Sequence, residues 1–117
     1  MEKIKFRAWS KTKQCIINWE NIKDNLSNFI NNDDYILMQY TGLKDENVKE
    51  IYEGDIISFS DLSISFTVAH IYFEKGCFYA DDKCPIGNVS LGYLVNNNRN
   101  VEVIGNIFEN PELLNGE

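Results

Sequence analysis

The chain has 117 residues, of which 44% are hydrophobic and 13% aromatic. This length and composition exclude a disordered chain and predict one folded domain over residues 1–117. The formal net charge of −7 argues against general nucleic-acid binding, because affinity for phosphates comes from clustered Lys and Arg. No apolar run approaches the roughly 20 residues of a membrane helix and no signal-peptide pattern opens the chain, so we expect a cytoplasmic protein without membrane contact.

The charge is unevenly distributed, with a balance of +4 in residues 1–13 and −11 in the remainder. Residues 3–9 alternate in the manner of a half-buried strand, with apolar side chains on one face and Lys5, Arg7 and Trp9 on the other. Such a basic face is either solvated or meets an acidic surface, in the same fold or on a neighbouring subunit. Trp9 is then a candidate interface anchor. If the acidic surface belongs to a neighbouring subunit, the protein is a homo-oligomer.

A turn at residues 10–13 leads into a second predicted strand, 14–19, which pairs with the first. Residues 21–30 change to helical spacing, with apolar side chains at i, i+4, i+7 and i+8. The Asn content of this segment favours a short helix.

The stretch LMQYTGLKDENVKEIYEGDII, residues 37–57, contains most of the recognisable pattern. Residues 35–40 are predicted to form a core strand that ends at Thr41-Gly42, followed by a charged surface turn over 43–49. The bend at Glu53-Gly54-Asp55 gives Gly54 the chance to adopt a positive φ before the next strand begins at Ile56.

The second half of the chain predicts four strands separated by turns, and a last helical turn. The strands are expected at 63–73, 77–80, 89–95 and 101–105, with a turn at 74–76, a loop at 81–88, an exposed tip at 96–100 and a helix start at Asn110-Pro111-Glu112. The fold class is therefore mainly β, a small single-domain barrel-like or sandwich fold with one short helix and a C-terminal helical turn.

The sequence offers few groups for catalysis. Cys15, Cys77 and Cys84 are odd in number and irregularly spaced, so we expect reduced, buried thiols. With His70, the only histidine, they do not give zinc spacing, and a Cys84–His70 thiol site would be the sole nucleophilic arrangement.

A calcium loop starting at Asp45 fails because Lys49 and Glu50 stand where an oxygen ligand and a Gly are needed. No Gly-rich phosphate loop is present either. We therefore predict no catalytic residues, no metal site and no cofactor.

Three blocks carry a resemblance. Besides residues 37–57, they are IKFRAW at residues 4–9 and VIGNIFENPEL at residues 103–113. In this order they resemble the YopX family of bacteriophage and prophage proteins, although Val48 stands where that family usually has Gly. The resemblance implies a small, mostly β, barrel-like domain and transfers no activity and no catalytic residue.

The absence of catalytic patterns and the surplus of aromatic side chains favour binding over catalysis. We expect a non-enzymatic phage or prophage accessory protein that acts by protein contact, as a homo-oligomer or docked on a host or phage protein. The candidate binding residues are Lys5, Arg7, Trp9, Tyr40, Tyr52, Glu53 and Asp55.

Two alternatives remain open at this point. One is a nucleic-acid-binding barrel that uses the basic N-terminal strand. The other is a metal-dependent enzyme in which Glu50, Glu53 and Asp55 converge.

Overall fold

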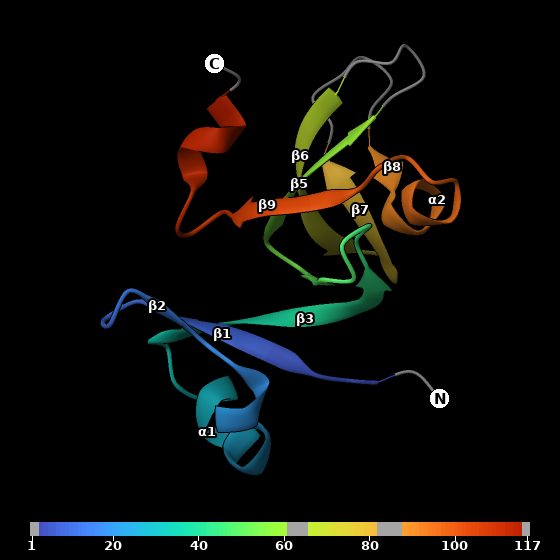
Figure 1. Cartoon of the computed structure of the whole chain (residues 1–117). Helices are drawn as coiled ribbons and strands as arrows, with labels where there is room; N and C mark the ends of the chain where they lie inside the picture. Colours follow the sequence, from blue (N-terminus) through green and yellow to red (C-terminus); the bar gives the residue numbers. More distant parts are fainter. Residues whose placement is uncertain (1–2, 61–65, 82–87, 116–117) are drawn as a thin grey trace.

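The computed structural model describes residues 3–60, 66–81 and 88–115, which form two antiparallel sheets joined by β3 (Figure 1). The first sheet has the strand order β2-β1-β3-β4, formed by β1 (Phe6–Ser10), β2 (Cys15–Ile17), β3 (Tyr35–Lys44) and β4 (Glu50–Tyr52). The second sheet has the order β8-β7-β6-β5-β9, formed by β5 (Asp55–Ser60), β6 (Phe66–Glu74), β7 (Cys77–Asp81), β8 (Val89–Ser90) and β9 (Glu102–Asn106). The prediction of a mainly β fold is confirmed.

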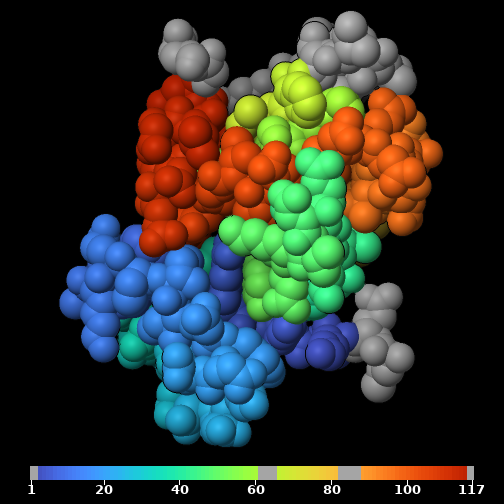
Figure 2. Space-filling view, viewed as in Figure 1, coloured from blue at the N-terminus to red at the C-terminus, as the bar shows by residue number. Residues whose placement is uncertain are grey.

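The helical elements are short and lie outside the sheets. They are the 3-10 turns η1 (Trp19–Asn21) and η2 (Lys23–Asn25), α1 (Leu26–Ile30), α2 (Leu91–Asn96) and the C-terminal η3 (Pro111–Asn115). No helix in the described part of the chain is long and apolar enough to cross a membrane. In the space-filling view, the segment from the end of β3 to β5, coloured green, lies between the two sheets (Figure 2).

The first sheet is built around β1, which pairs with β2 through Ala8↔Ile17 and with β3 through Ala8↔Leu37. The predicted hairpin at the start of the chain is therefore confirmed. The helix expected near residues 22–30 exists as η2 and α1, and Ile22, which precedes η2, is fully buried. The low helix propensity of the Asn residues in this segment favours short turns over one longer helix.

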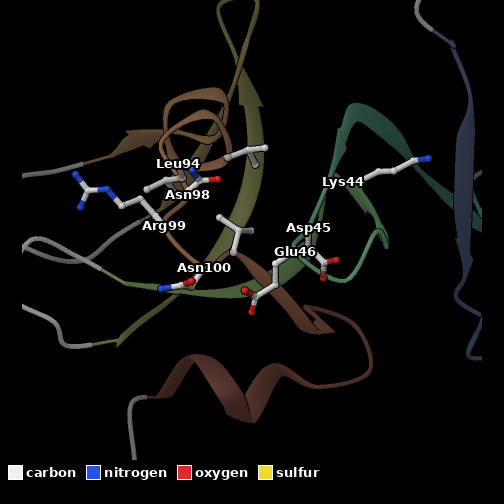
Figure 3. A pocket seen from close by; sticks show the side chains of 9 residues that line it. Lys44, Asp45, Glu46, Leu94, Asn98, Arg99 and Asn100 are labelled. Carbon is white, nitrogen blue, oxygen red and sulfur yellow. The ribbon is translucent and has the colours of Figure 1, made fainter.

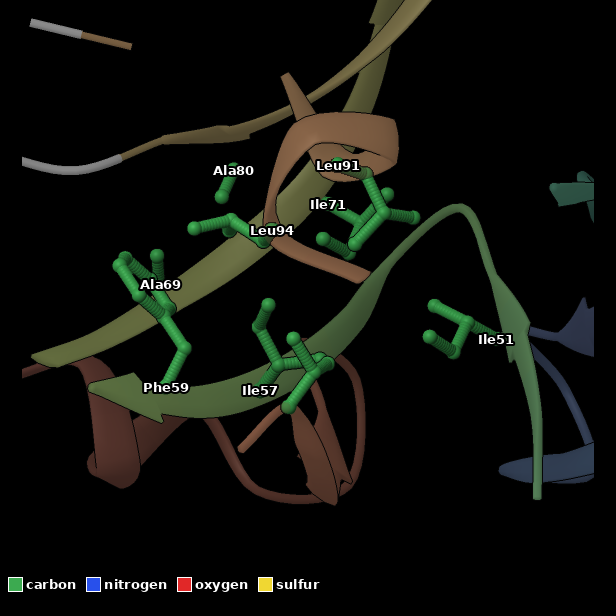
Figure 4. Packing of buried hydrophobic residues seen from close by; sticks show 9 residues of the cluster. Ile51, Ile57, Phe59, Ala69, Ile71, Ala80, Leu91 and Leu94 are labelled. Atoms are coloured by element: carbon green, nitrogen blue, oxygen red, sulfur yellow. The ribbon is translucent and has the colours of Figure 1, made fainter. Parts of the chain in front are cut away.

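The main hydrophobic core lies between the second sheet and α2 (Figure 4). Leu91 and Leu94 of α2 pack towards Ile57 of β5 and Ile71 of β6, and Ile51 of β4 belongs to the same cluster. Each such side chain contributes about 1.5–3 kcal/mol when fully buried. Because Ile51 comes from the first sheet, the same core also connects the two sheets.

The strand predicted at residues 89–95 is wrong beyond Ser90, where the chain turns into α2. Ser90 Oγ accepts a hydrogen bond from Tyr93 N at 3.4 Å and caps the helix. Leu91 and Leu94, spaced i, i+3, are both buried, which is helical periodicity.

The end predicted for the strand at Thr41-Gly42 is also wrong, because β3 continues to Lys44. Gly42 has a φ of +85°, and the register with β4 shifts between Tyr40 and Lys44. The glycine therefore permits a bulge in place of a turn. Beyond the bulge β3 still pairs with β4, and its Leu43 packs against the core of the second sheet.

The remaining predictions for the second half fare well. The turn at 74–76 joins β6 and β7, the last strand corresponds to β9, and a single helical turn, η3, follows. Residues 63–65 of the predicted strand and 82–87 of the predicted loop, including Cys84, lie outside the described residues. Cys15 is half-buried and Cys77 exposed, so the expectation of buried thiols is wrong for these two.

Two turn residues with positive φ predict stability changes of opposite sign. Val48 has a φ of +65° and is 69% exposed, a conformation that costs a non-glycine residue about 1–2 kcal/mol. Val48→Gly removes this strain from the folded state. Glycine also gives the unfolded chain more conformational entropy, which offsets roughly half of the gain, so we expect the free energy of unfolding to rise by about 0.5–1 kcal/mol.

Gly54, at φ +87°, has Met38 Sδ 2.9 Å from the position of an added Cβ. Gly54→Ala should therefore destabilise by about 1 kcal/mol or more. Urea unfolding measures both changes, with Val48→Ala, which keeps a Cβ, as the control. Equal midpoints for the parent and Val48→Gly would show that this turn is not strained.

Candidate functional site

The polar face of β1 lies against the connection between β4 and β5. Arg7 Nη2 is 2.7 Å from Asp55 Oδ1, with side-chain exposures of 13% and 3%. Lys5 Nζ is 2.5 Å from Glu50 Oε2. The basic strand thus meets an acidic surface, as one of its two interpretations predicts, and the acids belong to the same chain.

Two of the predicted binding residues, Tyr40 and Tyr52, lie between these ion pairs. They face each other across β3 and β4, with ring centroids 5.4 Å apart. Lys5 Nζ is 5.1 Å from the Tyr40 ring centroid and the Arg7 guanidinium 4.8 Å from that of Tyr52. Cations at such distances are attracted by the ring quadrupole. The cluster of Lys5, Arg7, Tyr40, Glu50, Tyr52 and Asp55, here called the joint, thereby connects the first sheet to the start of the second.

The electrostatics of the joint follow from its burial. Burial raises the pKa of Asp55, an effect that the Arg7 charge and the hydrogen bond from Tyr52 N, at 2.8 Å, offset only in part. The hydrogen bond to Glu50 raises the pKa of Lys5, and burial raises the pKa of Tyr52. Both Asp55 oxygens are used within the chain, so the joint is suited to holding the sheets together.

The other two predicted site residues also have partners within the chain. Trp9 is 7% exposed and stacks on Phe108, with ring centroids 5.2 Å apart. Glu53 Oε1 accepts a hydrogen bond from Gln39 N at 3.2 Å. The carboxylates of Glu50, Glu53 and Asp55 therefore have separate partners. No group of three His, Cys, Asp or Glu residues that could hold a metal is found in residues 3–60, 66–81 and 88–115.

Asp45 lies in the predicted turn at 43–49, and the sequence interpretation missed only its link to the second sheet. Its side chain is buried, and Oδ1 accepts from Asn47 N at 2.8 Å and Lys49 N at 2.9 Å. Oδ2 accepts from Val103 N of β9 at 2.8 Å. The first two bonds form an Asx-type turn, which the Asp-x-Asn spacing indicates. The third ties that turn to the edge of the second sheet.

A polar groove of about 260 Å³ lies between this turn and residues 98–101 (Figure 3). Its two cations do not converge, since Lys44 and Arg99 point to opposite sides of it. Arg99 Nη2 instead donates to Tyr93 Oη at 3.2 Å. The groove does not bring together charges that would hold an ionic ligand.

The side of the second sheet opposite α2 is partly covered, since η3 contacts β6 and Ile56 on this side is buried, but it leaves apolar side chains exposed. Strand register places Phe66, Val68, His70, Tyr72, Tyr79 and Asp81 on it together, a set here called the outer face. Phe66 is 66% and Val68 41% exposed. The Tyr72 and Tyr79 ring centroids are 5.6 Å apart, and His70 Nδ1 is 3.7 Å from Asp81 Oδ2.

The outer face continues into a hollow beside the first sheet. This hollow has about 160 Å³ and is lined by His70 and Tyr72 from the outer face, and by Ile36 and Phe108 among others. Ile36 is itself 37% exposed. The alternation of residues 63–73 was the available sequence signal for this surface, but it did not show which side the core would cover.

The structure defines a small two-sheet β protein with a charged joint and an exposed aromatic face. The family model described as YopX protein matches residues 5–115, and the chain therefore belongs to the YopX family. Among solved structures, it is similar to protein EF1440 from Enterococcus faecalis, with 25% identity, a TM-score of 0.67, and coverage of 97% of this chain and 99% of that one. None of the curated proteins searched matches the chain.

Proposed function

We propose that this YopX protein is a non-enzymatic interaction module, encoded by a phage or prophage and active in the cytoplasm, that binds a partner protein with its outer face. The observation that carries the proposal is the adjacent exposure of Phe66 and Val68 on one strand face, at 66% and 41%. Apolar side chains that gather on a surface mark interaction sites more often than isolated ones do.

The contacts within the joint favour the outer face as the binding surface, because the charged side chains of the joint already have partners in the same chain. Lys5 and Arg7 are paired with Glu50 and Asp55 inside the chain, so their charges are already compensated there. This removes the charge argument for a homo-oligomer held by the basic strand and weakens nucleic-acid binding through the same strand. A second copy of the chain would instead have to use the exposed apolar surface.

The proposal is tested with the double variant Phe66→Thr, Val68→Thr, which keeps strand propensity while removing apolar surface. Ile30→Thr is the matched control, because Ile30 is 59% exposed on α1, an element next to the first sheet. Tagged parent and both variants are used to capture proteins from host lysate, with and without nuclease treatment. We expect one protein to be retained by the parent and the control and lost with the double variant.

Equal capture by all three proteins would contradict the proposed surface, as would a partner that disappears after nuclease treatment. The mass of each protein in solution is measured in parallel. A dimeric parent with a monomeric double variant would identify a second copy as the occupant of the outer face.

A further inference from the structure

The charged strand residues on the side of the outer face all have one sign, and the nearest cation along the chain is Lys75 in the β6–β7 turn. The charged strand residues that share this side of the second sheet are Glu74, Asp81 and Glu102, since Glu74 pairs with Cys77, Asp81 with His70, and Glu102 with Ser58. No Lys or Arg of the described strands lies on this side. The exposed aromatic surface is therefore bordered by carboxylates and by no Lys or Arg of the described strands.

The tyrosines of this surface have the geometry to receive a cation. The Tyr72 and Tyr79 rings lie 5.6 Å apart, and Asp81 retains a side-chain exposure of 36%. Partial burial, followed by the charges of Glu74 and Asp81, raises the pKa of Tyr72. Tyr72 is thus a neutral ring in a negative field, an arrangement that attracts a guanidinium or ammonium group.

We propose that the outer face recognises a basic segment of its partner protein, in which Arg or Lys side chains alternate with apolar ones. The cations lie over Tyr72 and Tyr79 and pair with Glu74 and Asp81, while the apolar side chains cover Phe66 and Val68. This inference rests on the proposed function, for which it names the class of partner. Charge complementarity excludes a polyanion from the same surface.

The test is an NMR titration of the labelled protein with a short synthetic peptide of alternating Arg and Val or Thr. The same peptide with Glu in place of Arg, and a short single-stranded DNA, serve as separate arms. We expect the Arg peptide to shift the backbone amides of β6 and β7, and the other two ligands to leave them unchanged.

Two variants of equal net charge test whether the acids beside the outer face, and not the overall negative charge, bind the Arg peptide. Glu74→Gln with Asp81→Asn removes two acids from the outer side, whereas Glu20→Gln with Asp24→Asn removes two exposed acids from η1 and η2. We expect the first variant to bind the Arg peptide about fivefold or more weakly and the second to bind within about twofold of the parent. If the first variant does not fold, Glu74→Gln alone takes its place, with Glu20→Gln alone as its control.

Equal weakening in both variants would reveal a general attraction to an acidic protein and overturn the inference, as would shifts outside β6 and β7. The proposed binding surface and the basic nature of the partner are tested independently. A captured partner that is lost with the Phe66 and Val68 variant but unaffected by the Glu74 and Asp81 variant would keep the binding surface and overturn the basic partner. The outer face of one copy could instead bind the exposed Lys11 and Lys13 of a second copy. The protein would then form a salt-sensitive dimer, and this result would overturn the assignment to a separate partner.

Discussion

Arg7→Met is expected to lower the free energy of unfolding by about 3–5 kcal/mol, because it leaves a buried carboxylate without its cation. The Asp55 side chain is only 3% exposed and lies 2.7 Å from Arg7 Nη2. Met retains most of the aliphatic packing of Arg, so the loss reports the charge. Urea unfolding of the parent and the variant measures it.

The matched control is the double variant Arg7→Met, Asp55→Asn, which removes both charges. Replacing a whole buried ion pair is often close to neutral, and Arg7 Nε is already a buried atom without a hydrogen-bond partner among the described residues. We therefore expect the double variant to be more stable than Arg7→Met alone. A single variant within about 1 kcal/mol of the parent would show that the pair contributes little to the joint.

The penalty of Arg7→Met should depend on pH. Burial already holds the pKa of Asp55 above its ordinary value, and Arg7 is the main group that opposes this rise. Without Arg7 the folded pKa rises further, so the folded state binds more protons than the unfolded state between the unfolded and folded pKa values. Stability of the variant then falls as pH rises through this window.

The same reasoning predicts that the penalty shrinks at acidic pH, where Asp55 is protonated and needs no cation. Unfolding curves over a pH series test this expectation. Asp55→Asn in the Arg7→Met background should abolish the additional pH dependence. A penalty that is constant across the series would assign the loss to packing and not to charge.

Asp45→Ala is expected to cost about 3 kcal/mol, because it leaves three backbone N–H groups without their acceptor. Those groups belong to Asn47, Lys49 and Val103. Asp45→Asn keeps a side-chain oxygen that can accept from Asn47 N and Lys49 N, but its amino group cannot accept from Val103 N. We therefore expect Asp45→Asn to lose about half as much stability as Asp45→Ala. Urea unfolding measures both variants.

The control for Asp45 is Glu46→Ala, which truncates the exposed neighbouring acid and should change stability by less than about 0.5 kcal/mol. Amide hydrogen exchange provides a second measurement. The amides of Lys49 and Val103 should lose protection together in Asp45→Ala, because one carboxylate holds both. Faster exchange at only one of them would separate the turn from the β9 edge.

These two predictions also guide the choice of variants for binding experiments. Substitutions in the joint or at Asp45 act on how the sheets are held together, so a loss of binding in them would not locate a binding surface. Phe66 and Val68 are exposed on the opposite side of the sheet from the core residues Ala69 and Ile71. Binding losses there are separable from unfolding.

Features that depend only on neighbouring residues could be predicted from the amino-acid sequence. Two-residue alternation gave β1 and β6, the bend at Gly54 has its positive φ, and the turn at 74–76 joins two strands. The ordered motif blocks also identified the family, which the match over residues 5–115 shows. These signals are local, because backbone preference and turn chemistry act over only a few residues.

Where one sequence pattern is compatible with two local structures, long-range packing selects between them. Val89, Leu91, Tyr93 and Val95 alternate as in a strand, while Leu91 and Leu94 also fit a helix, and their burial under the second sheet selects the helix. Likewise, Gly42 permits a turn or a bulge, and pairing of β3 with β4 selects the bulge.

Most contacts of the candidate site also depend on long-range packing. Lys5 and Glu50 are 45 residues apart, Arg7 and Asp55 are 48, and Asp45 and Val103 are 58. The sequence identified Lys5, Arg7 and Asp55 as important but not their partners, since only the packing of the sheets brings them together. The same packing covers Ala69 and Ile71 and leaves Phe66 and Val68 exposed, because a strand has two faces and the core fills only one of them.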